Sequence, residues 1–173
     1  EVVTALGGTE RIREILNETG EITVPQTVRR PKVTGHIRFE DVHFEYPSRP
    51  DISVLKGIDL DILPGQKIAL VGQSGSGKST IASILMRLYP WQGGNITLDG
   101  IDIREMDLSS YRSVYAIVPQ EVLLFGGSIR ENILYGHPSA TEEELMNAAR
   151  ISNSLEFIQS FPEGFETIVG ERG

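Results

Sequence analysis

The sequence contains no cysteine, which excludes disulfide bonds and thiolate metal sites. No stretch approaches the roughly 18 consecutive apolar residues that a membrane-spanning helix needs. The first residues lack a basic region followed by an apolar block, so we expect no signal peptide. Basic residues are in deficit, because 16 Lys and Arg face 24 Asp and Glu, giving a net charge of −8. This balance argues against a nucleic-acid-binding surface, which needs a basic footprint.

What the chain does contain is the composition of an ordinary soluble globular protein. Its 173 residues are enough for one domain, or for one domain and an appendage. With 39% hydrophobic and 23% charged residues, the chain can bury a sizeable core without covalent staples.

The first 35 residues differ in character from the rest. Thr9 is typical of a helix N-cap, and Ile12, Ile15 and Leu16 then follow on one helical face. Residues 19–35 contain two prolines and no helical period, which is typical of an extended linker. We expect the main domain to begin near His36.

A β pattern follows the linker. Residues 36–46 and 54–62 alternate apolar and polar side chains, with a slip at Glu40 and Asp41 that indicates a β-bulge. Asp99-Gly100 lies between two apolar runs and predicts a hairpin turn. Residues 66–72 and 114–120 are apolar without alternation, as expected of strands buried on both faces.

Helical patterns occupy the remainder. Ile81, Ile84, Leu85 and Leu88 are spaced for one helical face, with Pro90 as the stop, and residues 107–113 form a shorter helical piece. After Gln120 the chain becomes helical. Three capping boxes predict helix starts there: Ser128 with Glu131, Thr141 with Glu144, and Asn153 with Glu156.

The segment "VGQSGSGKST" carries the clearest chemistry. Gly72, Gly77, Lys78 and Ser79 match G-x-x-x-x-G-K-[ST], between a predicted strand and a predicted helix. Glycines let the backbone N–H groups of such a loop converge on a phosphate, at the positive end of the following helix. The lysine supplies a cation and the Ser79 hydroxyl is suited to Mg²⁺. We expect this whole loop to bind phosphate: Gly72, Gln73, Ser74, Gly75, Ser76, Gly77, Lys78, Ser79 and Thr80.

Kinases, GTPases and ATPases all use such a loop, so the loop alone does not decide among them. GTPases read guanine with an Asn-Lys-x-Asp segment, which this sequence does not contain.

The wider sequence resembles the nucleotide-binding domain of ATP-binding cassette (ABC) exporters of the multidrug or peptide type. Three segments carry the resemblance, over about residues 37–173: "FEDVHFEYPSRPDISVLKGIDLDILPGQKIALVGQSGSGKSTIASILMRLY", "GNITLDGIDIREMDLSSYRSVYAIVPQEVLLFGGSIRENILYG" and "FPEGFETIVGERG". The resemblance implies a P-loop NTPase fold of the α/β class, with an antiparallel β part, a core of parallel strands and the start of an α-helical subdomain.

The resemblance also assigns an adenine site. Tyr46 stands where the family places an aromatic ring that stacks on adenine, and the alternative is a tyrosine packed at a strand end. Val54 is expected either to wall the ribose and adenine or to belong to the core. Gln73 is expected to face the nucleotide or a neighbouring subunit.

Gln120 resembles the glutamine that reaches Mg²⁺ or the attacking water in this family, and the alternative is a polar residue that ends a strand. The cofactors implied are ATP and Mg²⁺, with Ser79 and Gln120 as the metal-binding residues. Residues 167–173 resemble the exporter loop that touches the membrane domain, where Ile168 replaces an expected acidic residue and leaves Glu171 and Arg172 as the charges of interest.

Several family motifs are missing from the sequence: the signature motif, the Walker B aspartate, the general-base glutamate and the switch histidine. We therefore expect a fragment that is inactive alone. Its expected parts are residues 1–35, a helix and linker from an absent transmembrane domain; residues 36–127, the β part and P-loop core; and residues 128–173, a partial helical subdomain.

The resulting hypothesis is an ATPase that powers export across a membrane. Its expected partners are a membrane-spanning domain of the same transporter and a second nucleotide-binding domain, in a homo- or heterodimer at the cytosolic face of a membrane. Two rivals remain: a soluble cassette protein that uses ATP for work other than transport, and a P-loop kinase. A kinase would need an acceptor pocket and an arginine-rich lid, for which the sequence gives no sign.

Overall fold

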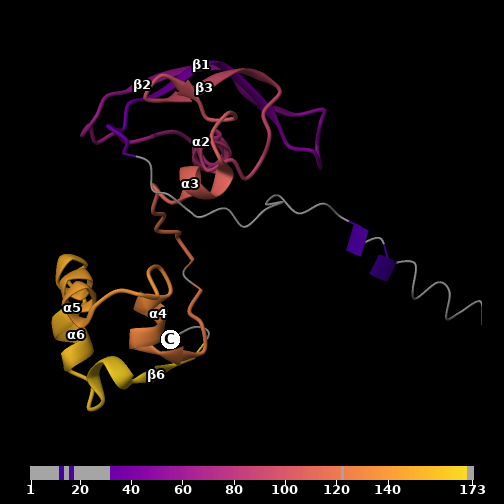
Figure 1. Ribbon diagram of the computed structural model, residues 1–173. Coiled ribbons are helices and arrows are strands. Elements are labelled where there is room, and N and C mark those ends of the chain that lie inside the picture. Colours follow the sequence, from indigo (N-terminus) through magenta and orange to yellow (C-terminus); the bar gives the residue numbers. More distant parts are fainter. Residues whose placement is uncertain (1–11, 14–15, 18–31, 122, 171–173) are drawn as a thin grey trace, which may run out of the picture. The chain divides into compact units, whose positions relative to one another are not determined.

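The computed structural model describes residues 12–13, 16–17, 32–121 and 123–170 (Figure 1). The chain divides into two compact units, residues 1–116 and 117–173. The finer division expected at residues 36 and 128 stays a prediction. Residues 12–13 and 16–17 are helical, whereas Thr9, Ile15 and most of the expected linker lie outside the described residues.

An antiparallel sheet forms the upper layer of the first unit (Figure 1). Its strands are β1 (Ile37–Glu45), β2 (Ser53–Ile62), β3 (Gly93–Leu98) and β4 (Ile101–Asp102), in the order β2-β1-β3-β4. The expected bulge is confirmed, because the register of β1 shifts between Phe39 and Val42 and Asp41 has a φ of 47°. A β-carbon on Gly94 would lie 2.2 Å from the Asp41 carbonyl oxygen, so only glycine lets β3 approach the bulge.

The hairpin predicted at Asp99-Gly100 is confirmed. These two residues join β3 to β4 with φ values of 52° and 82°, the left-handed pair that a two-residue hairpin loop needs.

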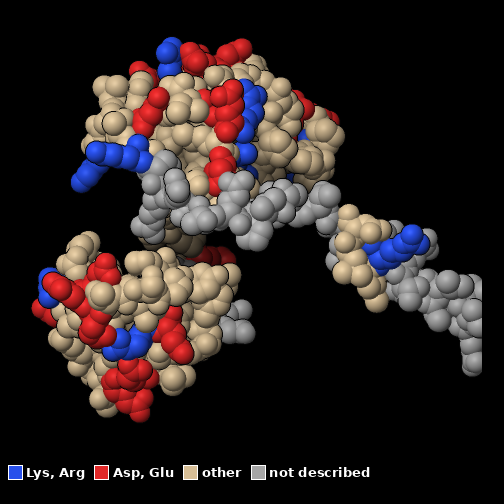
Figure 2. All heavy atoms as spheres, viewed as in Figure 1, with Lys and Arg blue, Asp and Glu red and all other residues tan. Residues whose placement is uncertain are grey.

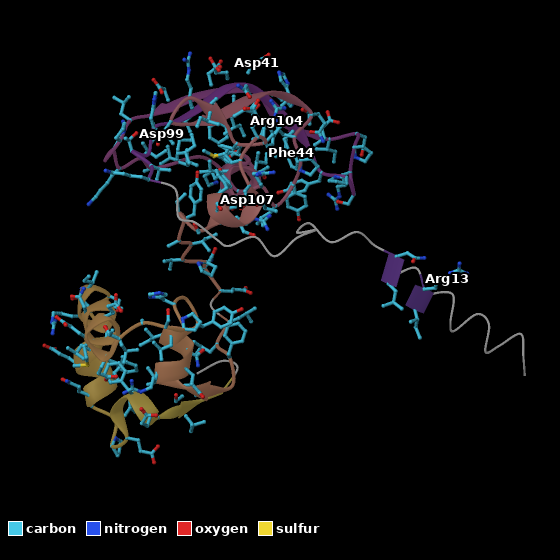
Figure 3. The ribbon with its side chains drawn as sticks, viewed as in Figure 1. Arg13, Asp41, Phe44, Asp99, Arg104 and Asp107 are labelled. Carbon is cyan, nitrogen blue, oxygen red and sulfur yellow. The ribbon has the colours of Figure 1, made fainter. Side chains whose placement is uncertain are left out.

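Two helices lie beneath the sheet (Figure 1). They are α2 (Lys78–Leu85) and α3 (Leu108–Arg112), and the Asp107 side chain caps α3 by accepting the Ser110 N–H. A core of fully or nearly fully buried side chains fills the space between these layers, with Phe44 visible there in Figure 3. Its members are Phe39, Val42, Phe44, Leu55, Ile84, Ile96, Leu98, Ile103 and Tyr111.

Helix α2 ends earlier than the sequence predicts. Its last residue is Leu85, and Arg87 takes a left-handed φ of 53° that stops the helix before Pro90 is reached. Leu88 is consequently half exposed and does not extend the apolar face.

The strands expected at residues 66–72 and 114–120 are wrong for the described structure. Neither segment has regular secondary structure, and Val71 and Val118 are 89% and 91% exposed. A strand needs a neighbour for its backbone N–H and C=O groups. Within the described residues neither segment is paired in either sheet, so the expected parallel core is not formed there.

The second unit is mainly helical, as expected. It contains α4 (Ile129–Leu134), α5 (Glu142–Ile151), α6 (Leu155–Gln159), a 3₁₀ turn η1 (Gly164–Glu166) and a small ladder between β5 (Gly127–Ser128) and β6 (Ile168–Val169). Leu145, Ala149 and Ile158 are its buried apolar residues.

Two of the three predicted capping boxes are confirmed, at Ser128–Glu131 and Thr141–Glu144. The third is wrong: Asn153 has a φ of 56° and Ser154 begins α6 without a side-chain cap. Asn153 is used to reverse the chain between two helices, a role for which asparagine is also suited. None of the described helices has the length and apolar character needed to cross a membrane.

Candidate nucleotide-binding site

The glycine-rich loop leads directly into α2, as the motif predicts. Gly77 is the N-cap of the helix, with a φ of 90°, and Gly75 has a φ of 81°. Gly77 is also packed against β2, because a β-carbon there would lie 2.8 Å from Leu55 Cδ2 and 3.5 Å from Val54 Cγ1. The loop is therefore seated on the sheet at a point where only a glycine fits.

Lys78 folds back over the loop it follows. Its Nζ donates to the carbonyl oxygens of Gly72 and Gln73 at 3.0 and 2.8 Å, and lies 3.4 Å from Ser76 Oγ. The ammonium group is thus held within the loop by neutral acceptors, and these bonds leave its positive charge uncompensated. An anion that reaches this loop meets a cation whose position is already set.

The first turn of α2 offers further anion donors. The N–H groups of Lys78, Ser79 and Thr80 precede the first i−4 bond, which Ile81 N makes to the Gly77 carbonyl, and no acidic residue lies in this turn. Ser79 is exposed, and its Oγ has no hydrogen-bond partner among the described residues. Its hydroxyl is therefore free to take a ligand.

The Thr80 side chain behaves differently from what the motif suggests. The residue is 5% exposed, and its Oγ1 lies 3.0 Å from the hydroxyl of Tyr46. The Thr80 hydroxyl is thus bonded to Tyr46, which follows β1. A contact between the Thr80 backbone N–H and phosphate stays a prediction.

The Tyr46 ring is half-buried and packs edge-to-face against two other rings. Its centroid lies 4.8 Å from that of Phe44 and 5.2 Å from that of Tyr89, with interplanar angles of 81° and 85°. Val54 is half-buried against the same core and beside Gly77. The structure thus brings the two residues expected at adenine to the start of α2.

The remaining residues of the loop are open to solvent. Gln73, Ser74 and Ser76 are exposed, and Ser76 Oγ packs close to Gly72, where a β-carbon would lie 2.7 Å from it. Their predicted contacts to phosphate or to a neighbouring subunit stay predictions.

Gln120 is exposed and belongs to the second unit, whereas the loop belongs to the first. Its role toward a nucleotide in that loop stays a prediction. Near the end of the second unit, Ile168 is exposed in β6, and the Thr167 carbonyl accepts the Ile129 N–H. Glu171 and Arg172 lie outside the described residues.

Sequence reasoning did not find Tyr89 or the Tyr46–Thr80 bond. The two bonded residues are 34 positions apart, and Tyr89 follows a helix as an isolated aromatic. No spacing rule could have joined them.

Comparisons with known proteins agree with the geometry. The family model described as ABC transporter matches residues 55–165. ABC transporter B family member 4 of Dictyostelium discoideum is 46% identical over 173 residues, covering 100% of this chain and 23% of that protein. Multidrug resistance protein pgp-1 of Caenorhabditis elegans is 44% identical over 172 residues, covering 98% and 13%. The chain therefore spans less than a quarter of the length of these curated relatives.

A solved structure of a bacterial Atm1-family ABC exporter with ATP bound is also similar. Its TM-score is 0.84 at 36% identity, and the match covers 97% of this chain and 29% of that chain.

Proposed function

The chain belongs to the ABC transporter family, and from this premise we propose that it is an ATP-binding domain that powers export of a substrate across a membrane. The observation that carries the proposal is the Lys78 ammonium held at 2.8–3.0 Å by two loop carbonyls, beside unpaired N–H groups at the start of α2. That arrangement suits the terminal phosphates of a nucleotide.

The roles of the other residues follow from where they lie. Tyr46 and Val54, at the edge of the core beside the start of α2, are placed to contact adenine and ribose. The exposed loop residues from Gly72 to Gly75 offer backbone N–H groups to the phosphates, whereas the Ser76 N–H donates to the Gln73 carbonyl.

Mg²⁺ is the second proposed cofactor. Among the described residues no cluster of three His, Cys, Asp or Glu side chains is arranged to hold a metal by itself. The free Ser79 hydroxyl fits a cation whose other ligands are phosphate oxygens, and Gln120 is the second proposed ligand. Ser79 and Gln120 would hold Mg²⁺ there, and the ion would supply positive charge to offset that of the phosphates.

The proposed catalytic contribution of the chain is positioning and electrostatics. The loop fixes the triphosphate, Lys78 offsets its charge, and Gln120 orients the attacking water. No covalent intermediate with the protein is required.

The names of two similar proteins support the proposal of a membrane-spanning partner. One relative is a multidrug resistance protein, the similar structure is an exporter, and another relative is the Mitochondrial potassium channel ATP-binding subunit of Xenopus tropicalis, 45% identical over 174 residues. We accordingly expect a membrane-spanning partner and a second nucleotide-binding domain. That this domain lies at the cytosolic face of a membrane is proposed from the family resemblance alone.

The test is calorimetric titration of the protein with Mg·ATP. Lys78→Ala should weaken binding at least about tenfold, because charge-assisted bonds to phosphate are lost. Lys56→Ala, an exposed lysine on β2, is the matched control and should bind like the wild type. Equal affinity of Lys78→Ala and Lys56→Ala would overturn the assignment of the loop.

A further inference from the structure

The hydrogen bond between Thr80 and Tyr46 connects the phosphate loop to the residue expected to stack on adenine. Thr80 is the third residue of α2, directly after the phosphate-binding Lys78 and Ser79, and Tyr46 directly follows β1. The bond between their hydroxyl groups measures 3.0 Å, and Thr80 is 5% exposed.

A threonine hydroxyl in a helix commonly bonds the carbonyl four residues earlier. Ser83 does this in the same helix, because its Oγ donates to the Ser79 carbonyl at 3.0 Å. Within the described residues the Thr80 hydroxyl bonds only Tyr46. Its buried polar group is thus committed to the ring expected at adenine, not to its own helix.

The Tyr46 ring is held on other sides as well. Phe44 and Tyr89 both meet it edge-to-face, at centroid distances of 4.8 and 5.2 Å. Rotation about the side-chain torsions would break the hydroxyl bond and both ring contacts together. The ring is therefore held in one orientation before any ligand arrives.

We propose that Thr80 is a positioning residue that sets Tyr46 in register with the phosphate loop, so that base and triphosphate are recognised as one unit. This inference rests on the proposed function and deepens it, since it gives Thr80 the task of favouring a complete nucleotide over bare polyphosphate. An aromatic ring that is already fixed loses less conformational entropy when adenine binds than a mobile ring does.

The experiment compares two ligands, ATP and inorganic tripolyphosphate, by calorimetry on the wild type, Thr80→Val, Tyr46→Phe and the double variant. Valine keeps the shape of threonine, and phenylalanine keeps the ring, so each removes one hydroxyl. We expect either change to lower the ratio of ATP to tripolyphosphate affinity by about two- to tenfold, the range for one hydrogen bond. The double variant should lose no more than the larger single loss, because both changes remove the same bond.

Thr80→Ser restores the hydroxyl, and the ratio should recover toward the wild-type value. A purely structural role for Thr80 would change the melting temperature without moving this ratio, which would overturn the inference. So would equal losses of ATP and tripolyphosphate, which would make Thr80 a phosphate contact, or additive losses in the double variant. If the wild type binds tripolyphosphate as tightly as ATP, the adenine site itself is wrong, and that failure is seen before any variant is made.

Discussion

Two glycines of the phosphate loop share a backbone conformation but differ in their surroundings. Gly75 and Gly77 have φ values of 81° and 90°, which L side chains rarely adopt. A β-carbon on Gly75 would meet nothing within 4 Å, whereas one on Gly77 would lie 2.8 Å from Leu55 Cδ2. Leu55 is buried in the core, so its methyl group can move only by displacing other core side chains.

Gly77→Ala should therefore destabilise the protein more than Gly75→Ala. Both carry the left-handed strain of roughly 1–2 kcal/mol. Only Gly77→Ala adds overpacking against Leu55, which costs typically about 1–3 kcal/mol more. Urea unfolding of the two variants measures the difference. Equal losses of unfolding free energy would show that the loop is not seated on β2 as described.

The motif predicted a glycine-rich loop that leads into a helix. The structure agrees, because Gly77 is the N-cap of α2 and Lys78 is its first residue. The motif did not predict where each hydroxyl points. Ser79 and Thr80 are adjacent and chemically alike, yet Ser79 is exposed and Thr80 is buried against Tyr46. A helix turns neighbouring residues to different faces, and which face meets a distant tyrosine is decided by tertiary packing.

At the scale of elements, the β3–β4 turn also fixes the entry of the chain into β1. The Asp99 carboxylate accepts bonds from Thr34 Oγ1 and from the N–H groups of Thr34, Gly35 and His36, at 2.5–3.0 Å. Figure 3 shows Asp99 at one end of the sheet. Sequence reasoning found this residue as a hairpin turn and missed its second role, since the residues it binds lie more than 60 positions away.

Asp99→Asn should lower stability at neutral pH and have little effect in acid. The pKa of Asp99 is lowered, first by the Thr34 hydroxyl and then by the N–H groups, against a desolvation effect that raises it. A lowered pKa means that the contribution is present above about pH 3.9, the unfolded value, and is lost as pH falls through the folded value. Because the Asp99 carboxylate is only partly buried, we expect Asp99→Asn to lower the free energy of unfolding by at most about 1 kcal/mol at neutral pH.

Urea midpoints at pH 7 and near the acid limit of folding measure this pH dependence. Asp51→Asn is the control, as an exposed aspartate with no hydrogen bond or ion pair among the described residues. A loss for Asp99→Asn that is independent of pH would show that the carboxylate charge is not what holds the linker.

The helical unit is joined by one arginine that no sequence pattern indicated. Arg130, in α4, bonds Glu142 at the start of α5 and Glu166 in η1, both at 2.5 Å. These contacts lower the pKa of Glu142 and raise that of Arg130 above its ordinary value. Several separate groups of acidic side chains lie on the visible face of this unit (Figure 2), so the sequence alone does not say which of them Arg130 binds.

Arg130→Met should lower the melting temperature at low ionic strength, because α5 and η1 both lose their ion pair with α4. The difference from the wild type should shrink in 1 M salt, which screens exposed ion pairs. Arg150→Met, at the end of α5, is the control, since Arg150 makes no ion pair among the described residues. A loss that salt leaves unchanged would mean that the arginine stem, not its charge, joins the elements.

Local signals predicted the elements where local interactions decide them. The two confirmed capping boxes close within four residues, and the Asp99-Gly100 turn within two. The end of α2 and the start of α6 were missed because Arg87 and Asn153 adopt left-handed conformations that their residue types permit but do not demand.

At the scale of the whole molecule, the largest departure from the sequence prediction concerns two apolar segments. Residues 66–72 and 114–120 have the composition of buried parallel strands, yet neither is paired within the described part of the chain. Parallel strands pair with strands that are distant in sequence. Composition therefore predicts that such a segment is buried, but it does not identify the strand that pairs with it. Their exposed apolar side chains include Val71, Ile117 and Val118.

Exposed apolar side chains on a segment whose backbone is not paired in a sheet form a site for association between chains. We therefore expect a chain in which these two segments are exposed to self-associate at micromolar concentrations, as species with exposed apolar surface do. Replacing Val118, which is 91% exposed, together with Ile117 by lysine should reduce the association, since charge on an exposed apolar segment opposes its burial against another chain. Ile151→Lys is the control, because this residue is also exposed but ends a helix with its own hydrogen bonds. Sedimentation velocity across a concentration series measures the result.

If the control reduces association as much as the double variant, general charge and not the apolar segment governs it. If the wild type stays monomeric throughout, the exposed segments do not drive association and the prediction is wrong.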